Sequence, residues 1–256
     1  MAFIKRFFKG LYMSFSMFCT IPLPFKIWDD ASANLMLPMF PLVGVLVGVL
    51  WWGVAHVLML TGIHVMLTSA IFMLMPFLAT GFLHLDGYMD TSDAILSRRP
   101  LEDKLRILKD PNAGAFSVIM LAVLFILQFA ASFAVIENGR YFILLIVITV
   151  VSRCCSGLSG LCLKTLEQSG YVNMFRQGAG GRHKICLIVI AAIAFAFAYF
   201  IAGFYGISVA ALTVAGFVGA MAYAYFGLKG VSGDLMGFAL VISELCGLVA
   251  LSVMWR

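Results

Sequence analysis

The sequence predicts an all-α, polytopic integral membrane helical bundle, and three observations support this fold class. Of the 256 residues, 63% are hydrophobic and only 11% are charged, whereas an ordinary soluble domain has roughly 25% charged residues. The mean hydropathy is +1.05. Charged side chains are absent from the long windows 31–85, 111–136, 141–152 and 185–228. We therefore expect one integral membrane domain over residues 1–256.

The N-terminal segment is amphipathic, and we expect it to form a helix at the membrane interface. Lys5, Arg6 and Lys9 precede the apolar run 11–21, as in helices that lie on anionic headgroups. Two prolines follow this run in place of a signal-peptide cleavage site. A short extra span is the alternative to a retained interfacial helix.

The remaining chain has room for about seven transmembrane helices, because a helix needs about 20 apolar residues to cross a bilayer. We expect spans at 36–60, 64–85, 114–136, 141–163, 185–202, 206–226 and 235–255. The segments between these spans alternate between charged and nearly bare. Since Lys and Arg are enriched in cytoplasmic loops, we expect a multi-pass protein of the inner (cytoplasmic) membrane with its charged segments in the cytoplasm.

The net charge of +5 is explained by basic loops that face anionic lipid headgroups. Membrane lipid is therefore an expected partner, and no nucleic acid is expected. A homo-oligomer is compatible with this composition.

Three aspartates, Asp86, Asp90 and Asp93, directly follow the second expected span. On a helix, positions i, i+4 and i+7 share one face, so the three carboxylates should lie close together. Such carboxylates repel one another unless a hard divalent cation takes their oxygens as ligands. A solvated loop explains the nearby Lys and Arg residues but not three acids on one helix face at the end of a span. We interpret the cluster as a metal site.

The segment 86–112 carries most of the polar chemistry of the chain. A short interfacial helix is expected after Pro100, because Leu101, Leu105 and Leu108 recur at helical spacing. Aspartate-bound metal beside basic residues is typical of phosphoryl transfer, in which the metal neutralises phosphate oxygens. A substrate that contains a pyrophosphate would fit this site best.

Polar residues elsewhere allow both a functional and a structural interpretation. Arg153 lies inside the fourth expected span, where an unpaired guanidinium costs about 2.5–3.5 kcal/mol or more. Its partner is a phosphate, an acid of the site, or Glu244 in a structural pair. Asp234 opens the last span, either as a helix cap or as a ligand-binding group. The basic, glycine-rich loop 164–184 either closes over an anionic ligand or only anchors the bundle.

Several short motifs occur in a fixed order along the chain. They are T-I-P-L-P at 20–24, F-P-L-V-G at 40–44, H-L-D-G at 84–87, Asp90-Thr91 with Asp93, Lys109-Asp110 with Gly114, S-R at 152–153, and Gly233-Asp234 with Gly237 and Glu244. This order resembles the cobalamin synthase family, the adenosylcobinamide-GDP ribazoletransferases, and the likeness extends over most of the chain.

The resemblance implies a Mg²⁺-dependent transferase that performs the last assembly step of cobalamin biosynthesis. A hydroxyl of α-ribazole, or of its 5′-phosphate, would attack the phosphorus on the cobinamide arm of adenosylcobinamide-GDP and release GMP. On the matching positions, Asp86, Asp90 and Asp93 would hold Mg²⁺. Asp110 would complete the site or take the hydroxyl proton, with Asp86 as the rival proton acceptor. The substrate-binding candidates are His84, Lys109, Arg153, Asp234 and Glu244.

Two other functions stay open on the sequence. A CDP-alcohol phosphotransferase also uses aspartates spaced along a helix, but Met89-Asp90 stands here in place of the Ala-Arg of its D-G-x-x-A-R opening. A cation transporter would place its acids near the bilayer midplane, often on broken helices in repeated halves, whereas most acids of this chain lie at one edge.

Overall fold

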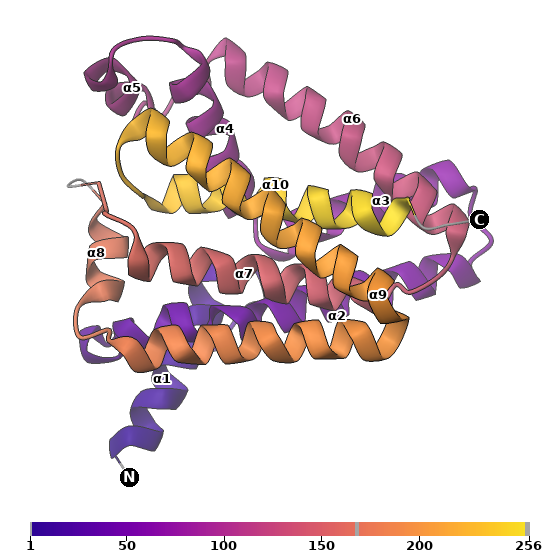
Figure 1. Cartoon of the computed structure of the whole chain (residues 1–256), viewed down its shortest axis with the longest axis horizontal. Helices are drawn as coiled ribbons and strands as arrows, with labels where there is room; N and C mark the ends of the chain where they lie inside the picture. Colours follow the sequence, from indigo (N-terminus) through magenta and orange to yellow (C-terminus); the bar gives the residue numbers. More distant parts are fainter. Residues whose placement is uncertain (1, 167–168, 254–256) are drawn as a thin grey trace.

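The computed structural model describes residues 2–166 and 169–253, and every regular element in those ranges is a helix (Figure 1). The elements are α1 (Ala2–Phe18), the 3₁₀ helix η1 (Asp30–Leu35), α2 (Met36–Leu60), α3 (Val65–Ala79), α4 (Leu83–Leu96), α5 (Leu101–Ile107), α6 (Ala115–Asn138), α7 (Leu144–Cys162), α8 (Gly170–Arg176), α9 (Gly181–Leu228) and α10 (Gly233–Ser252). The predicted all-α fold class is confirmed.

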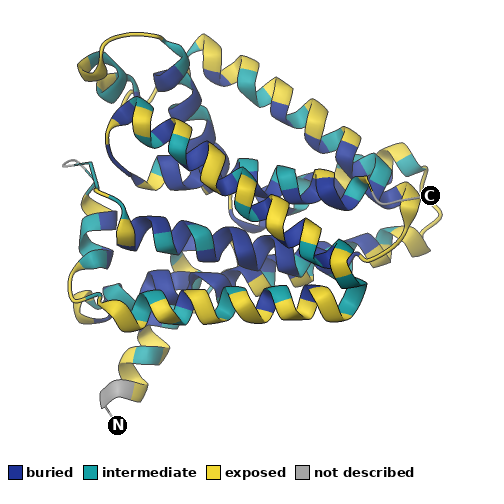
Figure 2. Ribbon diagram, in the orientation of Figure 1, coloured by how far each residue is buried: buried dark blue, intermediate teal, exposed yellow. Residues whose placement is uncertain are grey.

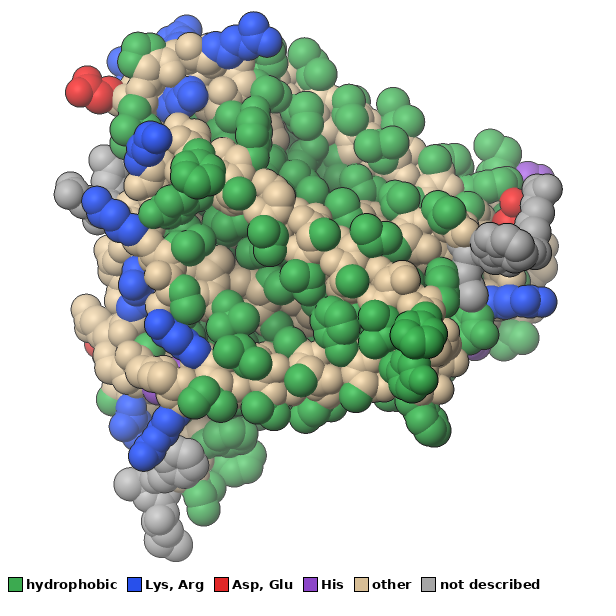
Figure 3. Space-filling model, viewed as in Figure 1, with side chains coloured by type: hydrophobic (Ala, Val, Ile, Leu, Met, Phe, Trp, Pro, Cys, Tyr) green, Lys and Arg blue, Asp and Glu red, His purple; other side chains and the backbone are tan. Residues whose placement is uncertain are grey.

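Helices α7 and α10 form the centre of the bundle. α7 packs against α2 and α9, and α10 packs against α9 and α4. Figure 2 shows that these two helices are mostly buried, whereas α6 and α9 expose one face along their length. The exposed faces carry large apolar side chains such as Ile126, Phe200 and Phe226, and Figure 3 shows this apolar surface over the middle of the molecule. Lipid is the solvent that such a surface requires.

Five helical segments of the described residues are long and apolar enough to cross a bilayer, and the bent pair α3–α4 makes a sixth. α9 is itself two helices, since Ala202 and Gly203 leave helical φ/ψ values, and Figure 1 shows that its second half doubles back. The predicted spans 185–202 and 206–226 correspond to these halves. By length and composition the described residues hold five or six candidate spans, so the predicted number of seven crossings stays a prediction.

The second predicted span, 64–85, is wrong in its last third. α3 ends at Ala79, and α4 leaves it at an angle of 91°. The break contains Gly81 and Phe82, with φ values of 60° and 62°. α3 has 15 residues, which rise about 22 Å and fall short of the roughly 30 Å of a hydrocarbon core.

The N-terminal segment supplies hydrogen bonds at this break. The backbone N–H of Thr20 donates to the carbonyl of Ala79 at 3.0 Å, and its hydroxyl donates to the carbonyl of Leu78 at 2.9 Å. A helix end leaves carbonyls of this kind without partners. The T-I-P-L-P motif at 20–24 thus holds the corner from which α4 departs.

α1 packs on the bundle through its C-terminal half, where Met13 and Phe18 are buried. Its other half extends away from the bundle (Figure 1), and its Lys9 pairs with Asp29 at 3.0 Å. With 17 residues, α1 is not among the helices of the described residues that could cross a bilayer. This arrangement favours the predicted interfacial helix over the extra span.

Lys and Arg side chains gather at one end of the bundle, as Figure 3 shows along the left edge of this face. Two of the charged segments meet there, because Thr165 and Val231 form a parallel β-bridge. The predicted alternation of charged and bare segments is therefore matched by the fold. That the charged end faces the cytoplasm stays a prediction.

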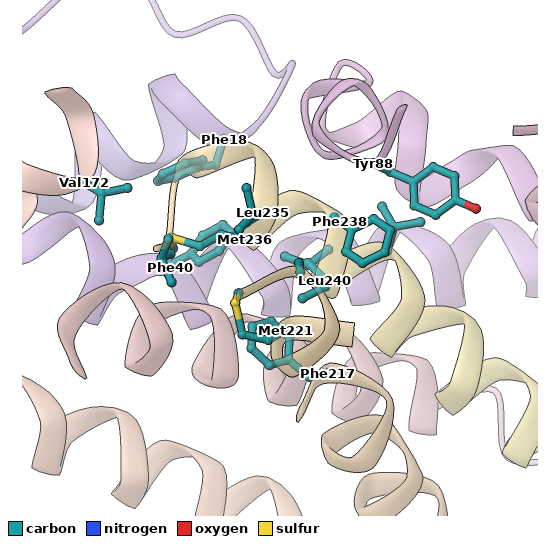
Figure 4. Close-up of a cluster of buried hydrophobic side chains, with 14 of the residues drawn as sticks. Phe18, Phe40, Tyr88, Val172, Phe217, Met221, Leu235, Met236, Phe238 and Leu240 are labelled. Atoms are coloured by element: carbon teal, nitrogen blue, oxygen red, sulfur yellow. The ribbon is translucent and has the colours of Figure 1, made fainter. Parts of the chain in front are cut away.

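A buried hydrophobic cluster fixes α4 against α10 and α1 against α2 (Figure 4). The rings of Tyr88 and Phe238 stack with centroids 5.6 Å apart, and those of Phe18 and Phe40 lie 4.5 Å apart. The Tyr88 hydroxyl also donates to the carbonyl of Met120 on α6 at 3.0 Å. These contacts set the position of the aspartate-bearing helix.

Candidate active site

Two glycines let α4 and α10 cross with their backbones almost in contact. A Cβ atom on Gly87 would lie 2.8 Å from both the Cα and the carbonyl oxygen of Asp234. A Cβ on Gly237 would lie 3.1 Å from the carbonyl oxygen of His84. Any larger residue at either position would push the helices apart. The crossing brings the start of α10 against the polar face of α4.

The three aspartates of α4 share one face, as predicted, and Asp234 joins them. Asp86 is exposed, while Asp90, Asp93 and Asp234 are half-buried. Asp90 lies within electrostatic range of the other three carboxylates. Within the described residues none of the four forms an ion pair. Neighbouring carboxylates that repel one another and form no ion pair favour the binding of a cation.

Asp93 is the most constrained of the four carboxylates. A Cβ on Gly114 would lie 2.1 Å from its Oδ2 atom, so only glycine leaves room for the carboxylate there. Gly114 is the residue that caps the N-terminus of α6. The Asp93 carboxylate therefore faces the positive end of a helix dipole.

The donor set of the site fits a hard divalent cation such as Mg²⁺, because all four groups are carboxylates. Within the described residues, however, no group of three or more Asp, Glu, His or Cys side chains is placed so that it could hold a metal ion together. Mg²⁺ is usually bound by one or two carboxylates together with waters and substrate phosphates. The site fits a cation shared with a bound substrate, and the set of three aspartate ligands stays a prediction.

Two clefts border the aspartates, one at Asp93 and one at Asp234. The larger, of about 490 Å³, is lined by Asp93, Ser97, Arg99, Arg106, Ile107, Asp110, Gly114, Ala115 and Phe116. The smaller, of about 180 Å³, is lined by Leu108, Lys109, Leu166, Ser169, Gly170, Tyr171, Ser232, Gly233 and Asp234. Each cleft combines at least one carboxylate with at least one cation. This combination suits a metal-bound phosphate whose remaining charge is held by Lys or Arg.

Asp110 lies at the rim of the larger cleft on an exposed turn. Its Oδ1 atom accepts hydrogen bonds from the backbone N–H of Asn112 at 2.9 Å and from the side-chain amide of Asn112 at 2.8 Å. These bonds, the backbone one first, hold the pKa of Asp110 below its ordinary value. A carboxylate stabilised in this way is a weak proton acceptor, which favours the metal-ligand alternative or Asp86 as the base.

Arg153 and Glu244 form an ion pair inside the bundle, between α7 and α10. The guanidinium also donates to the carbonyl of Thr149 at 2.9 Å, and its carbon lies 5.6 Å from the ring centroid of Phe40. The side chain of Arg153 is 0% exposed. Arg153 therefore forms the structural ion pair with Glu244 that was one of its predicted alternatives. The geometry gives no support to substrate binding by this pair.

His84 also lies behind the site. It is buried at the start of α4, with its ring 5.7 Å from the ring of Phe40 and 6.3 Å from that of Phe18. Its Nε2 atom has no hydrogen-bond partner in the described residues. His84 is buried at the α4–α10 crossing, beside Gly237. A contact of His84 with substrate stays a prediction.

The structure adds residues that sequence reasoning did not single out. Arg99 and Arg106 line the larger cleft. From the sequence, the positive-inside rule alone was enough to explain these two residues. Tyr171 lines the smaller cleft next to Lys109, so the first part of the loop 164–184 does reach the site. The pattern of acids on α4 could not reveal these partners, because they come from other elements.

Comparisons with known proteins agree with these motifs. A family model described as cobalamin-5-phosphate synthase matches residues 10–252. An adenosylcobinamide-GDP ribazoletransferase of Clostridium botulinum is 37% identical over 245 residues, covering 96% of this chain and 97% of that protein. The protein of the same name from Clostridium perfringens is 37% identical over 251 residues, covering 98% of this chain and 100% of that protein. No solved structure matches this chain.

Proposed function

This chain belongs to the cobalamin-5-phosphate synthase family and is a transferase of cobalamin biosynthesis, and from that premise we propose its substrates and its chemistry. The enzyme joins adenosylcobinamide-GDP to α-ribazole, or to α-ribazole 5′-phosphate, and releases GMP. The observation that carries the proposal is the α4–α10 crossing, which gathers four carboxylates beside two clefts that contain Lys and Arg.

The carboxylates of Asp86, Asp90 and Asp93, with Asp234 beside them, are the groups that would hold Mg²⁺. When bound, the ion neutralises charge on the diphosphate oxygens and makes the phosphorus more electrophilic. The chain supplies the remaining positive charge. Lys109 lines the smaller cleft and Arg99 and Arg106 line the larger one, so a diphosphate bound in either cleft has a cation within that cleft.

The proton of the attacking hydroxyl needs an acceptor within hydrogen-bond reach. We assign this role to Asp86, which is exposed on the site face of α4. The hydroxyl oxygen forms a bond to the phosphorus on the cobinamide arm, the bond from that phosphorus to the GMP oxygen breaks, and the proton passes to the carboxylate. GMP leaves with the electron pair of the broken bond.

The site opens at the end of the bundle that gathers Lys and Arg, and the positive-inside rule places such an end in the cytoplasm. Nucleotide-linked substrates are soluble and would reach the site from that compartment. The enzyme accordingly works as a multi-pass protein of the inner membrane with its active site facing the cytoplasm.

Purified full-length protein tests the proposal directly. GMP formation from adenosylcobinamide-GDP should require an acceptor, either α-ribazole or its 5′-phosphate, and should stop when EDTA removes divalent cations. Formation of a phospholipid from a CDP-alcohol, with no GMP formed from adenosylcobinamide-GDP, would assign the chain to the other phosphotransferase class. Metal uptake into proteoliposomes that is unaffected by both substrates would identify the chain as a transporter.

A further inference from the structure

Another cavity lies away from the aspartates, where α1 meets the starts of α2 and α9. It has a volume of about 480 Å³ and is lined by Arg6, Phe7, Asn34, Leu35, Pro38, Met39, Gly178, Arg182, His183 and Cys186. None of these residues lines either cleft of the active site. The proposed reaction makes no use of this cavity.

The polar wall of the cavity is cationic. Arg6 and Arg182 are exposed residues on two different helices, and no acidic side chain is among the described residues that line the cavity. The nearest acids in the sequence are engaged elsewhere, since Asp29 pairs with Lys9 at 3.0 Å and Asp30 accepts from the Trp28 indole at 2.8 Å. Within the part of the chain that the structure describes, neither Arg6 nor Arg182 forms an ion pair.

The backbone adds to this positive wall. The first half of α9 begins at Gly181, and Arg182 and His183 of its first turn line the cavity, so the positive end of this helix dipole lies beside it. Arg6 is held in place because its guanidinium donates to the carbonyl of Ala31. The Nδ1 atom of His183 accepts from the backbone N–H of Gly180 at 3.0 Å, which shapes the turn. Arg6 is thus oriented before a ligand arrives.

The wall also has an apolar part, which includes residues of α2 and α9. Pro38 and Met39 are buried at the start of α2, and Cys186 lies in the second turn of α9. Both helices are candidate spans. The cavity therefore opens at the depth where a bilayer changes from headgroups to acyl chains, with its cations on the headgroup side.

We propose that this cavity is a binding site for an anionic phospholipid, whose phosphate lies between Arg6 and Arg182 and whose glycerol and first acyl carbons cover Leu35, Pro38 and Met39. A free phosphate would use the cations but not the apolar wall. A zwitterionic lipid would use the apolar wall but would bring its own cation beside the two arginines. An anionic phospholipid matches both parts, and it ties the interfacial helix α1 to the bundle.

The test uses full-length protein in detergent, with thermal unfolding as the readout. Adding phosphatidylglycerol should raise the unfolding temperature more than adding phosphatidylcholine does. Arg6→Gln and Arg182→Gln should each weaken the response to phosphatidylglycerol about fivefold in apparent affinity, as expected for one cation at a lipid surface. Lys5→Gln and Lys184→Gln are the matched controls, because these cations neighbour the two arginines but do not line the cavity.

Controls that respond like the arginine variants would show that general surface charge binds lipid and would overturn the site. An equal stabilisation by inorganic phosphate would also overturn it, because a free anion would then suffice. A chemical readout covers the case in which a variant does not fold. In the unaltered protein, phosphatidylglycerol should slow alkylation of Cys186, which lines the cavity, and should leave alkylation of the exposed Cys162 unchanged; equal slowing of both would count against the site.

Discussion

Gly87 on α4 lies directly against the backbone of Asp234 on α10. A Cβ atom at residue 87 would come within 2.8 Å of the Cα and carbonyl oxygen of Asp234, a distance at which something must move. This contact converts three aspartates on one helix into a site formed by two helices. The chemistry assigned to the chain therefore depends on a helix crossing as much as on the acids themselves.

Gly87→Ala should separate α4 from α10 and lower the rate of GMP formation at least tenfold, with an overpacking cost to stability of roughly 1–3 kcal/mol. The measurement is enzymatic rate together with thermal unfolding. Gly219→Ala is the control, because a Cβ at that helical glycine meets nothing within 4 Å. Equal rates for the two variants would show that the crossing does not position the site.

Asp234→Asn should raise the Mg²⁺ concentration needed for half-maximal activity about 10- to 100-fold, the range for losing a group that supports a metal site. The reason is that Asp234 faces Asp90 and shares the negative charge that attracts the cation. A Mg²⁺ titration of the rate measures this. An unchanged titration with a reduced maximal rate would assign Asp234 to the substrate instead.

Removing one member of the Arg153–Glu244 pair should destabilise the protein by about 3–5 kcal/mol, because the other charge stays buried without a partner. Thermal unfolding of Arg153→Met and of Glu244→Leu should show this loss. The combined variant should recover stability and activity, because apolar residues can replace a buried pair. A double variant that folds but forms no GMP would restore the substrate-binding role for these residues.

Asp110→Asn should lower kcat/KM less than tenfold and leave the acid limb of its pH profile in place. The hydrogen bonds from Asn112 lower the pKa of Asp110, so this carboxylate is ionised at every pH above its ordinary value of about 3.9 and does not titrate near neutrality. A general base contributes roughly 10²–10⁴-fold. A loss of that size, with the acid limb removed, would identify Asp110 as the proton acceptor.

The sequence was sufficient for the fold class and for the face shared by the α4 aspartates, because both follow from local patterns of hydropathy and helical spacing. The corner at Gly81 and Phe82 was missed, since an uncharged window does not show whether the chain inside it is straight. It depends on Thr20, which is distant in sequence and supplies hydrogen bonds to the end of α3.

The contacts of the buried polar residues, and of the residues that line the clefts, were harder to predict because they join distant parts of the sequence. Arg153 lies 91 residues from Glu244 in the sequence. The position of Arg153 inside a span could not show whether its partner is Glu244 or a phosphate. Asp234 could be a simple helix cap until Gly87 placed it beside Asp90. The positive-inside rule already explained Arg99 and Arg106, so the sequence offered no separate reason to expect them in a cleft.

The most direct test of the central claim compares GMP formation by Asp90→Asn with that by Glu102→Gln at saturating Mg²⁺. Asp90 lies among three other carboxylates at the crossing, whereas Glu102 is an exposed acid on the neighbouring α5. We expect Asp90→Asn to fold into detergent micelles normally and to form no measurable GMP, and Glu102→Gln to match the unaltered enzyme. Unaltered turnover by folded Asp90→Asn would contradict a metal-dependent transfer at this cluster.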